Sequence, residues 1–320
     1  MPEATFVRDF GKTRITAAGA YGAGELIQLA NGKAGYYDST TAASTGDGIV
    51  FTSAGTVTVA KATGVVLLDG GRAYWDHSAN NVTFKPVNDR DFYVGTIVGD
   101  SGSGDSVCTV DLNAQQENII DFNRDVFATV LAGTPAVTAA GFGDPRVRGG
   151  GRKFHISSTS EAQKVDMLSQ RGFARTANAI VEFIFNVIDD GAGTVVDVSM
   201  GLANATHATD ADSITESLFI HLNANDVNVY AESDDGSTEV AATDTTVDYT
   251  AATPIEVWMD LRNEADIQIY LDGVLVLGAT VFKLDAATGP LKGLIHIEKT
   301  SAADVYELDV DRFVVRLAQQ

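Results

Sequence analysis

The chain has 320 residues, of which 45% are hydrophobic and 20% charged, and its formal net charge is −21 at pH 7. This length suits two domains that each bury a core, and no apolar run reaches the roughly 20 residues that a membrane-spanning helix needs. A chain this acidic repels phosphate backbones and anionic lipids, so we expect neither nucleic acid nor a membrane among its partners. The first ten residues lack the pattern of a secretion signal, which predicts synthesis in a cytoplasm.

The first part of the chain, as far as Asn113, consists of short alternating runs interrupted by Gly, Asn, Asp and Ser. Such a pattern is typical of an all-β barrel or sandwich. Within it, Gly71–Phe84 predicts a β-hairpin, because turn formers separate two stretches of period-two alternation. We expect its aromatic residues, Tyr74 and Trp75, to lie in the core.

Several runs in this region resemble the capsid decoration, or cement, proteins of tailed bacteriophages. These runs are Gly48–Phe51, Thr56–Ala62, Gly71–Asp76, Asn81–Thr83, Val94–Val98 and Val107–Asn113. The resemblance implies a small β-domain without an active site, which binds the outer surface of the assembled shell of the phage major capsid protein as a homotrimer. It also implies that the terminal segment contacts the capsid, through Ala4, Thr5, Phe6, Val7, Arg8, Asp9 and Phe10.

The segment 114–125, AQQENIIDFNRD, has a composition compatible with a helix and follows a completed β-pattern. We interpret it as a linker between a decoration domain (1–113) and a second domain (126–320).

The start of the second domain carries a loop rich in Gly, Pro and Ala over residues 134–151, with a basic cluster at Arg146, Arg148, Arg152 and Lys153. This cluster either binds a partner or balances nearby carboxylates. Ser158 and Glu161 then have the spacing of a capping box, which predicts a short helix over Glu161–Ser169.

From Ala179 onward the alternation is strong. One face of the first strand is formed by Val181, Phe183, Phe185 and Val187, and the other by Ile180, Ile184 and Ile188. Apolar residues on both faces indicate a buried strand. Further alternating runs follow, and Asp272-Gly273 predicts a two-residue hairpin, so we expect a β-sandwich.

The stretches Trp258–Arg262 and Ile267–Val274 resemble the concanavalin A-like, or laminin G-like, jelly-roll superfamily, over roughly Phe127–Leu317. The resemblance implies a fold that hosts lectins, glycosidases and structural modules, so it does not by itself indicate a function.

One enzymatic pattern is present. Glu307, Asp309 and Asp311 alternate along a strand, as in the Glu-x-Asp-x-Glu strand of laminarinase-like glycosidases, which this stretch resembles. The shorter Asp311, the position at the end of the domain and the lack of a tryptophan cluster speak against catalysis. We therefore expect no enzyme, and a solvated strand face paired with Arg312 or Lys299.

Calcium is the one cofactor that the sequence leaves open, because loops rich in Asp and Asn supply hard oxygen ligands. These candidate glycan or calcium residues are Asp189, Asp190, Asp210, Asp212, Asn225, Asp226, Asp234 and Asp235. The alternative is that they bond to their own turns. The five histidines show no ligand spacing, so we expect no zinc site.

These observations predict a virion protein on the outer capsid surface. The decoration domain would stabilise the shell, and the acidic, lectin-like jelly roll would project outward, with surface glycans as a further partner. Two alternatives remain: a virion-associated or secreted glycan-active enzyme that uses Glu307, Asp309 and Asp311, and a head-fibre structural protein without a ligand.

Overall fold

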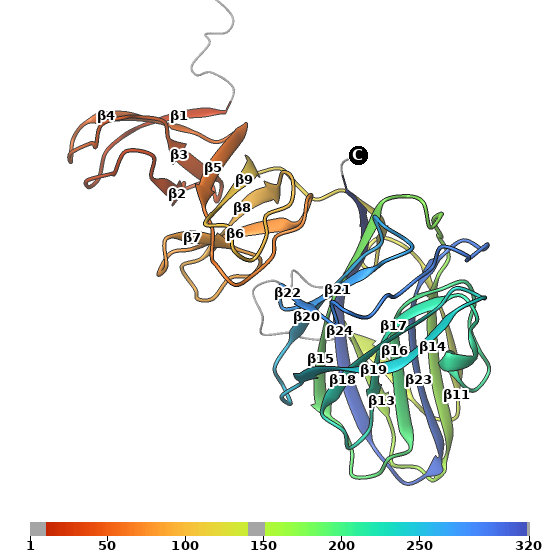
Figure 1. The fold of residues 1–320 in the computed structure, drawn as a ribbon. Coiled ribbons are helices and arrows are strands. Elements are labelled where there is room, and N and C mark those ends of the chain that lie inside the picture. Colours follow the sequence, from red (N-terminus) through yellow and green to blue (C-terminus); the bar gives the residue numbers. More distant parts are fainter. Residues whose placement is uncertain (1–10, 140–150, 319–320) are drawn as a thin grey trace, which may run out of the picture. The chain divides into compact units, whose positions relative to one another are not determined.

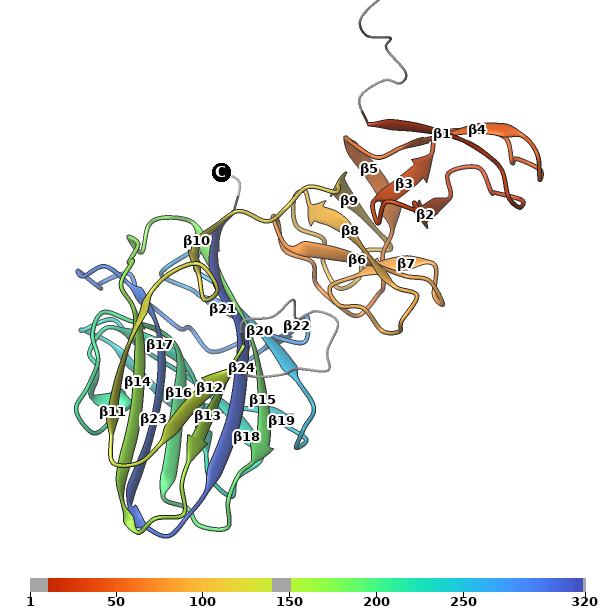
Figure 2. The same ribbon diagram turned by 180° about the vertical axis from the view of Figure 1, so that it is seen from behind.

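The computed structural model describes residues 11–139 and 151–318. The chain divides into two compact units between Gln116 and Glu117, and both units are built from β-strands (Figures 1 and 2). The predicted all-β class is therefore confirmed. Among the described residues, no helix is long and apolar enough to cross a membrane.

The first unit contains two antiparallel sheets. One has the order β1-β4-β3-β2, with β1 (Lys12–Thr16), β2 (Leu26–Gln28), β3 (Ala34–Tyr37) and β4 (Gly48–Thr52). The other has the order β5-β9-β8-β6-β7, with β5 (Thr56–Ala60), β6 (Arg72–Asp76), β7 (Asn81–Thr83), β8 (Phe92–Ile97) and β9 (Val107–Leu112). Asn113 joins the two sheets, because its amide nitrogen donates to the carbonyls of Ala34 and Ser53.

The hairpin predicted over Gly71–Phe84 is present as β6 and β7. Tyr74 and Trp75 are buried, as expected for core residues. Asp76 closes the turn, because its Oδ1 accepts hydrogen bonds from the Ser78 hydroxyl (2.6 Å) and from the backbone N–H groups of Ser78 and Ala79. The bond from the Ser78 hydroxyl is the main reason that the pKa of Asp76 is lowered.

The second unit is a jelly-roll sandwich of two antiparallel sheets. The first, which we call the β24 sheet, has the order β12-β13-β24-β15-β20-β21-β22, and β10 also pairs with β24. Its strands are β10 (Asn118–Asp121), β12 (Ala136–Ala139), β13 (Arg152–Ile156), β15 (Ala179–Asp189), β20 (Ile255–Asp260), β21 (Gln268–Leu271), β22 (Val274–Val276) and β24 (Tyr306–Leu317).

The second sheet, which we call the site sheet, has the order β11-β14-β23-β16-β17-β18-β19. Its strands are β11 (Phe127–Ala132), β14 (Glu161–Ser169), β16 (Val196–Ala203), β17 (Ser217–Asn223), β18 (Asn228–Asp234), β19 (Glu239–Asp248) and β23 (Lys292–Ala302). A single apolar core fills the space between the two sheets, with side chains from both.

The strand predicted to be buried on both faces is β15, which lies between β24 and β20. Its two alternating faces are both buried, as Phe183 and Ile184 illustrate. The hairpin at Asp272-Gly273 is also confirmed, because both residues have positive φ (47° and 77°), as a type I′ turn requires.

Three sequence interpretations are wrong. Glu161–Ser169 is strand β14 and not a helix, because its alternating residues place Val165 and Met167 in the core. The segment interpreted as a linker contains β10, which pairs with β24. Part of the predicted loop over 134–151 is β12, and Arg152 and Lys153 of the basic cluster belong to β13. The other two members, Arg146 and Arg148, lie outside the described residues.

Candidate functional site

A row of polar side chains crosses the outer face of the site sheet. The strand registers pair the following residues in turn: Asp166, His296, Ser199, His221 and Tyr230. Their neighbours along each strand point into the core, so these side chains point away from it. Five strands therefore bring to one line residues that are far apart in the sequence.

The connection from β16 to β17 lies against the sheet beside this row. Ala211 and Ile214 from this connection pack with Phe219 and Leu294 of the sheet in a small apolar cluster. Within the connection, a single 3₁₀ turn, η1 (Ala211–Ser213), begins at Asp210, which accepts a hydrogen bond from the Asp212 N–H. The cluster and the turn together position Asp212 beside the polar row.

A buried carboxylate holds this connection in place, and a glycine lets the two flanking strands lie close together. The Glu216 carboxylate accepts hydrogen bonds from the backbone of Thr288 and Gly289 and from the Asn204 amide. Gly201 has a φ of 152°, and an added Cβ would lie 2.1 Å from the Leu218 carbonyl oxygen. The close approach of β16 and β17 therefore requires glycine at this position.

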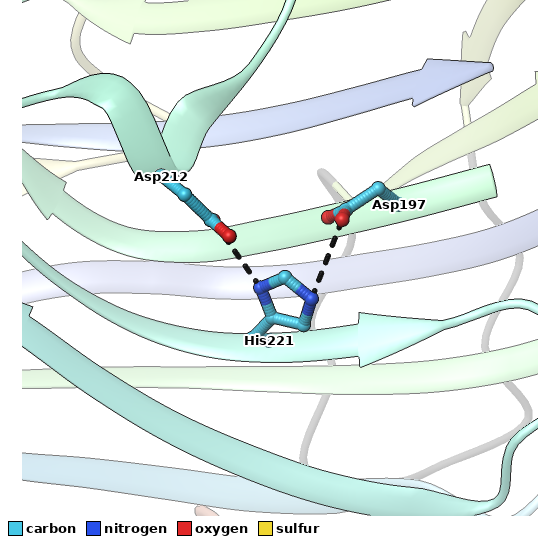
Figure 3. Close-up of side chains that lie close together, drawn as sticks. All are labelled: Asp197, Asp212 and His221. Carbon is cyan, nitrogen blue, oxygen red and sulfur yellow. Dashed lines mark ion pairs between the residues drawn. The ribbon is translucent and has the colours of Figure 1, made fainter. Parts of the chain in front are cut away.

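His221 lies at the centre of the site (Figure 3). Its Nδ1 is 3.4 Å from Asp212 Oδ1 and 3.5 Å from Glu232 Oε1, and its Nε2 is 3.4 Å from Asp197 Oδ2. Nε2 is also 3.3 Å from Asn223 Oδ1. The ring is buried, whereas the Asp212 side chain is 46% exposed. The site therefore reaches solvent on the Asp212 side.

The carboxylates around His221 change one another's proton affinity. Burial alone would lower the pKa of His221, but Asp212, Glu232 and Asp197 outweigh it and raise this pKa to about 11. Burial raises the pKa of Asp197 to about 7, and the acidic neighbours Asp212 and Glu298 add to this effect against the opposing charge of His221. The site thus gathers several carboxylates around a single imidazole ring.

A second buried histidine lies in the same row. His296 Nδ1 is 2.6 Å from Asp166 Oδ1, and both side chains are at most 1% exposed. Asp166 Oδ2 also contacts Lys164 Nζ at 2.8 Å, and Glu298 lies 3.3 Å from His296 Nε2. Around His296, the two carboxylates of Asp166 and Glu298 are accompanied by two basic groups, His296 itself and Lys164. Within the described part of the chain, His221 is in contrast the one basic group among three carboxylates.

A cavity of about 530 Å³ lies beside the His221 cluster. Its lining residues are Ala132, Ala162, Gln163, Lys164, Thr194, Val195, Val196, Asp197, Ala208, Thr209, Asn223, Glu298, Lys299 and Thr300. Asp197 and Asn223 belong both to this wall and to the surroundings of His221. The wall therefore offers carboxylate, amide and hydroxyl groups to a ligand, and none of these lining residues is aromatic.

The predicted glycan or calcium residues do not form one site. Only Asp210 and Asp212 lie at the His221 cluster. The Asp226 and Asp190 carboxylates accept hydrogen bonds from the hydroxyls of Tyr230 and Tyr249. The side chains of Asp189, Asp234 and Asp235 accept hydrogen bonds from backbone N–H groups of their own turns. Asn225 donates its backbone N–H to the Asp190 carbonyl.

Sequence reasoning missed the strand residues of the site, namely Asp197, His221 and Glu232. Each is one of the polar residues that alternate with apolar ones along its strand, a pattern that is typical of any half-exposed sheet. Only the strand registers bring them together. The predicted capsid-contact residues, Ala4 to Phe10, lie outside the described residues.

The enzymatic pattern on β24 differs from its expected setting. Strand β24 is central, between β13 and β15, and Asp309 and Asp311 are 5% and 1% exposed. The expectation of a solvated face was therefore wrong. Glu307 contacts His155 (3.1 Å) and Lys153 (3.3 Å), and burial raises the pKa of Asp309.

The side chains of the two cations expected beside these carboxylates have other partners in the structure. Arg312 donates its backbone N–H to Asp311 Oδ1, and its guanidinium group binds Glu182 and Glu256. Lys299 Nζ donates to the carbonyls of Ser157, Thr159 and Asp304.

No family model and no curated protein matches the chain. Among solved structures, the carbohydrate recognition domain of Emp47p is 11% identical and covers 58% of this chain and 88% of its own, with a TM-score of 0.40. The carbohydrate-binding module CBM66 from Bacillus subtilis is 10% identical over 60% of this chain and 97% of its own, with a TM-score of 0.38. A carbohydrate esterase from the Shiga toxin-encoding bacteriophage phi24B is 10% identical over 60% and 90%, with a TM-score of 0.39. Likenesses of this size carry no argument about function.

Proposed function

We propose that the chain is a bacteriophage capsid decoration protein that binds the outside of the assembled shell and displays the sandwich outward. The observation that carries this proposal is that the runs resembling cement proteins include β6, β7 and β9, within one antiparallel sheet of a separate unit. A small unit with its own fold can attach to a shell while a second unit stays free for another task. Because the decoration protein would bind only the assembled shell, its binding would stabilise the assembled state by mass action. Shell sites of local threefold symmetry favour a homotrimer.

The test uses undecorated shells of the phage that encodes the chain. We expect the full chain to sediment with the shells until the sites are saturated. A variant that lacks residues 1–10 is expected to bind at least about tenfold more weakly, because the resemblance places the capsid contacts there. Equal binding by this variant would refute the contact assignment. Failure of the full chain to sediment with the shells would refute the decoration role.

A second candidate function concerns the sandwich alone: binding of a surface glycan in the cavity beside His221. The volume of about 530 Å³ is within the usual range for small-ligand sites, and the polar wall offers hydrogen bonds to sugar hydroxyls. Many weakly binding copies on one shell would act together. This proposal includes no catalytic step, since Glu307 is engaged by Lys153 and His155 and Asp309 is buried.

A glycan array probed with the full chain tests the second candidate. We expect the exposed substitution Ala208→Trp, which fills the cavity wall, to abolish binding that the exposed control Ala241→Trp retains. Silence of the wild-type chain on the array would leave the sandwich as a ligand-free structural unit. Hydrolysis of a β-glucan that is lost in Glu307→Gln would instead support the enzymatic alternative.

A further inference from the structure

Two buried polar atoms of the site face each other without a hydrogen bond. Among the described residues, His221 Nδ1 and Glu232 Oε1 have no hydrogen-bond partner, although the two residues are only 4% and 7% exposed. Leaving such atoms unsatisfied inside a protein is destabilising. The pair therefore points to a group that binds between them.

The spacing of the surrounding atoms fits a metal ion. Two ligands that each lie about 2.1 Å from an ion at a tetrahedral angle are about 3.4 Å apart. The measured separations from Nδ1 are 3.4 Å to Asp212 Oδ1 and 3.5 Å to Glu232 Oε1. These distances are too long for good hydrogen bonds and suit neighbouring ligands of one ion.

The charges also favour a cation. The Asp212 and Glu232 carboxylates both approach the same ring nitrogen, His221 Nδ1, at 3.4 and 3.5 Å, so a cation at this point would offset their mutual repulsion. Asp197 adds a third carboxylate, and one ligand atom each of Asp197, Asp212 and His221 lies within 4.8 Å of the others. A protonated His221 could itself supply the positive charge, and this alternative is what the experiment must exclude.

We propose that this site binds a divalent transition-metal ion, such as Zn²⁺ or Mn²⁺, through His221 Nδ1 and the carboxylates of Asp212 and Glu232. The ring then donates its Nε2–H to Asp197, the arrangement by which a carboxylate commonly orients a metal-bound histidine. Imidazole is a ligand for these ions, whereas Ca²⁺ prefers an all-oxygen set. The half-exposed Asp212 provides the entry path.

Metal binding has a structural consequence. Asp212 belongs to the connection between β16 and β17, whereas His221 and Glu232 belong to the sheet. An ion shared among them fastens this connection to the sheet and stiffens the wall of the neighbouring cavity, which Ala208 and Thr209 of the same connection help to form.

The experiment is a calorimetric titration of the full chain, first freed of metal by dialysis against a chelator, with Zn²⁺, Mn²⁺ and Ca²⁺ in turn. We expect one Zn²⁺ or Mn²⁺ per chain, with weaker binding of Ca²⁺. Asp212→Asn and His221→Gln are expected to weaken binding at least about tenfold, as loss of a ligand does. The matched controls Glu239→Gln and His77→Gln, which change an exposed acid and a histidine of the first unit, should bind as the wild type does.

Asp212→Asn separates the loss of a metal ligand from the loss of the fold. The Asp212 side chain is half-exposed, so its substitution is an implausible cause of misfolding. The proposal is overturned if the wild-type chain binds neither Zn²⁺ nor Mn²⁺, in which case protonated His221 is the only cation at the site. It is equally overturned if Asp212→Asn binds with unchanged affinity, or if Ca²⁺ binds more tightly than both other ions. Since neither a capsid nor a glycan is present, the outcome is independent of the proposed function.

Discussion

Replacing Glu182 with alanine is expected to lower the free energy of unfolding of the sandwich unit by about 3–5 kcal/mol. Glu182 accepts hydrogen bonds from Arg312 Nη2 and from Arg316 Nε (2.5 Å), and Arg312 also binds Glu256 at 2.8 Å. Glu182 and Arg316 are 2% and 1% exposed. The substitution removes a carboxylate from two guanidinium groups that stay buried, which is far costlier than the loss of an exposed ion pair.

The measurement is differential scanning calorimetry of the full chain, because the chain contains two compact units and need not unfold in one transition. We expect the transition of the sandwich to move to lower temperature while that of the first unit stays in place. The exposed Glu239→Ala is the control and should shift neither. A loss below about 1 kcal/mol for Glu182→Ala would mean that the network does not stabilise the sandwich.

Asp166→Asn is expected to lower the free energy of unfolding of the sandwich by about 2–4 kcal/mol. The loss is somewhat smaller than for Glu182→Ala, because His296 can respond by losing its proton. The pair is completely buried at 2.6 Å. Burial alone would raise the pKa of Asp166, but His296 and Lys164 outweigh it and lower this pKa. Burial alone would lower the pKa of His296, but Asp166 and Glu298 outweigh it and raise this pKa.

The sign of the pH dependence follows from these two shifts. The lowered pKa of Asp166 adds stability above about pH 4, and this stability is lost as the pH falls through the pKa in the folded state. The raised pKa of His296 adds stability below about pH 6.5, and this stability is lost as the pH rises through the pKa in the folded state. The pair is therefore strongest between about pH 4 and 6.5.

Urea denaturation at several pH values checks this expectation. The deficit of Asp166→Asn relative to the wild type should be largest near pH 5 and should shrink towards both acid and alkali. Asp248→Asn changes an exposed aspartate and should give no pH-dependent deficit. A deficit of constant size across the pH range would show that packing, and not the ion pair, is what the substitution removes.

Local patterns predicted much of the fold. Apolar residues on both faces identified β15, and Asp272-Gly273 identified the hairpin between β21 and β22. Both signals depend only on a few neighbouring residues. The capping-box spacing of Ser158 and Glu161 misled, because Glu161 is the first residue of β14. There Glu161 uses its carboxylate to accept a hydrogen bond from the Thr134 N–H. A local cap signal was outweighed by the alternation that buries Val165 and Met167.

The site could not be predicted in the same way. Asp166 and His296 are 130 positions apart in the sequence, yet they face each other on neighbouring strands. The position of β24 was equally hidden, because the last strand of the chain lies in the middle of its sheet. Strand order and register are set by long-range pairing, and a single sequence carries no local signal for them.

Electron cryomicroscopy of undecorated shells mixed with the purified full chain tests the central claim, attachment to the capsid, most directly. The account predicts added density on the outer surface of the shell, at positions of local threefold symmetry, with the sandwich projecting outward. A variant lacking residues 1–10 should leave these positions bare. Shells that show no added density after incubation with a saturating excess of the wild-type chain would contradict the account.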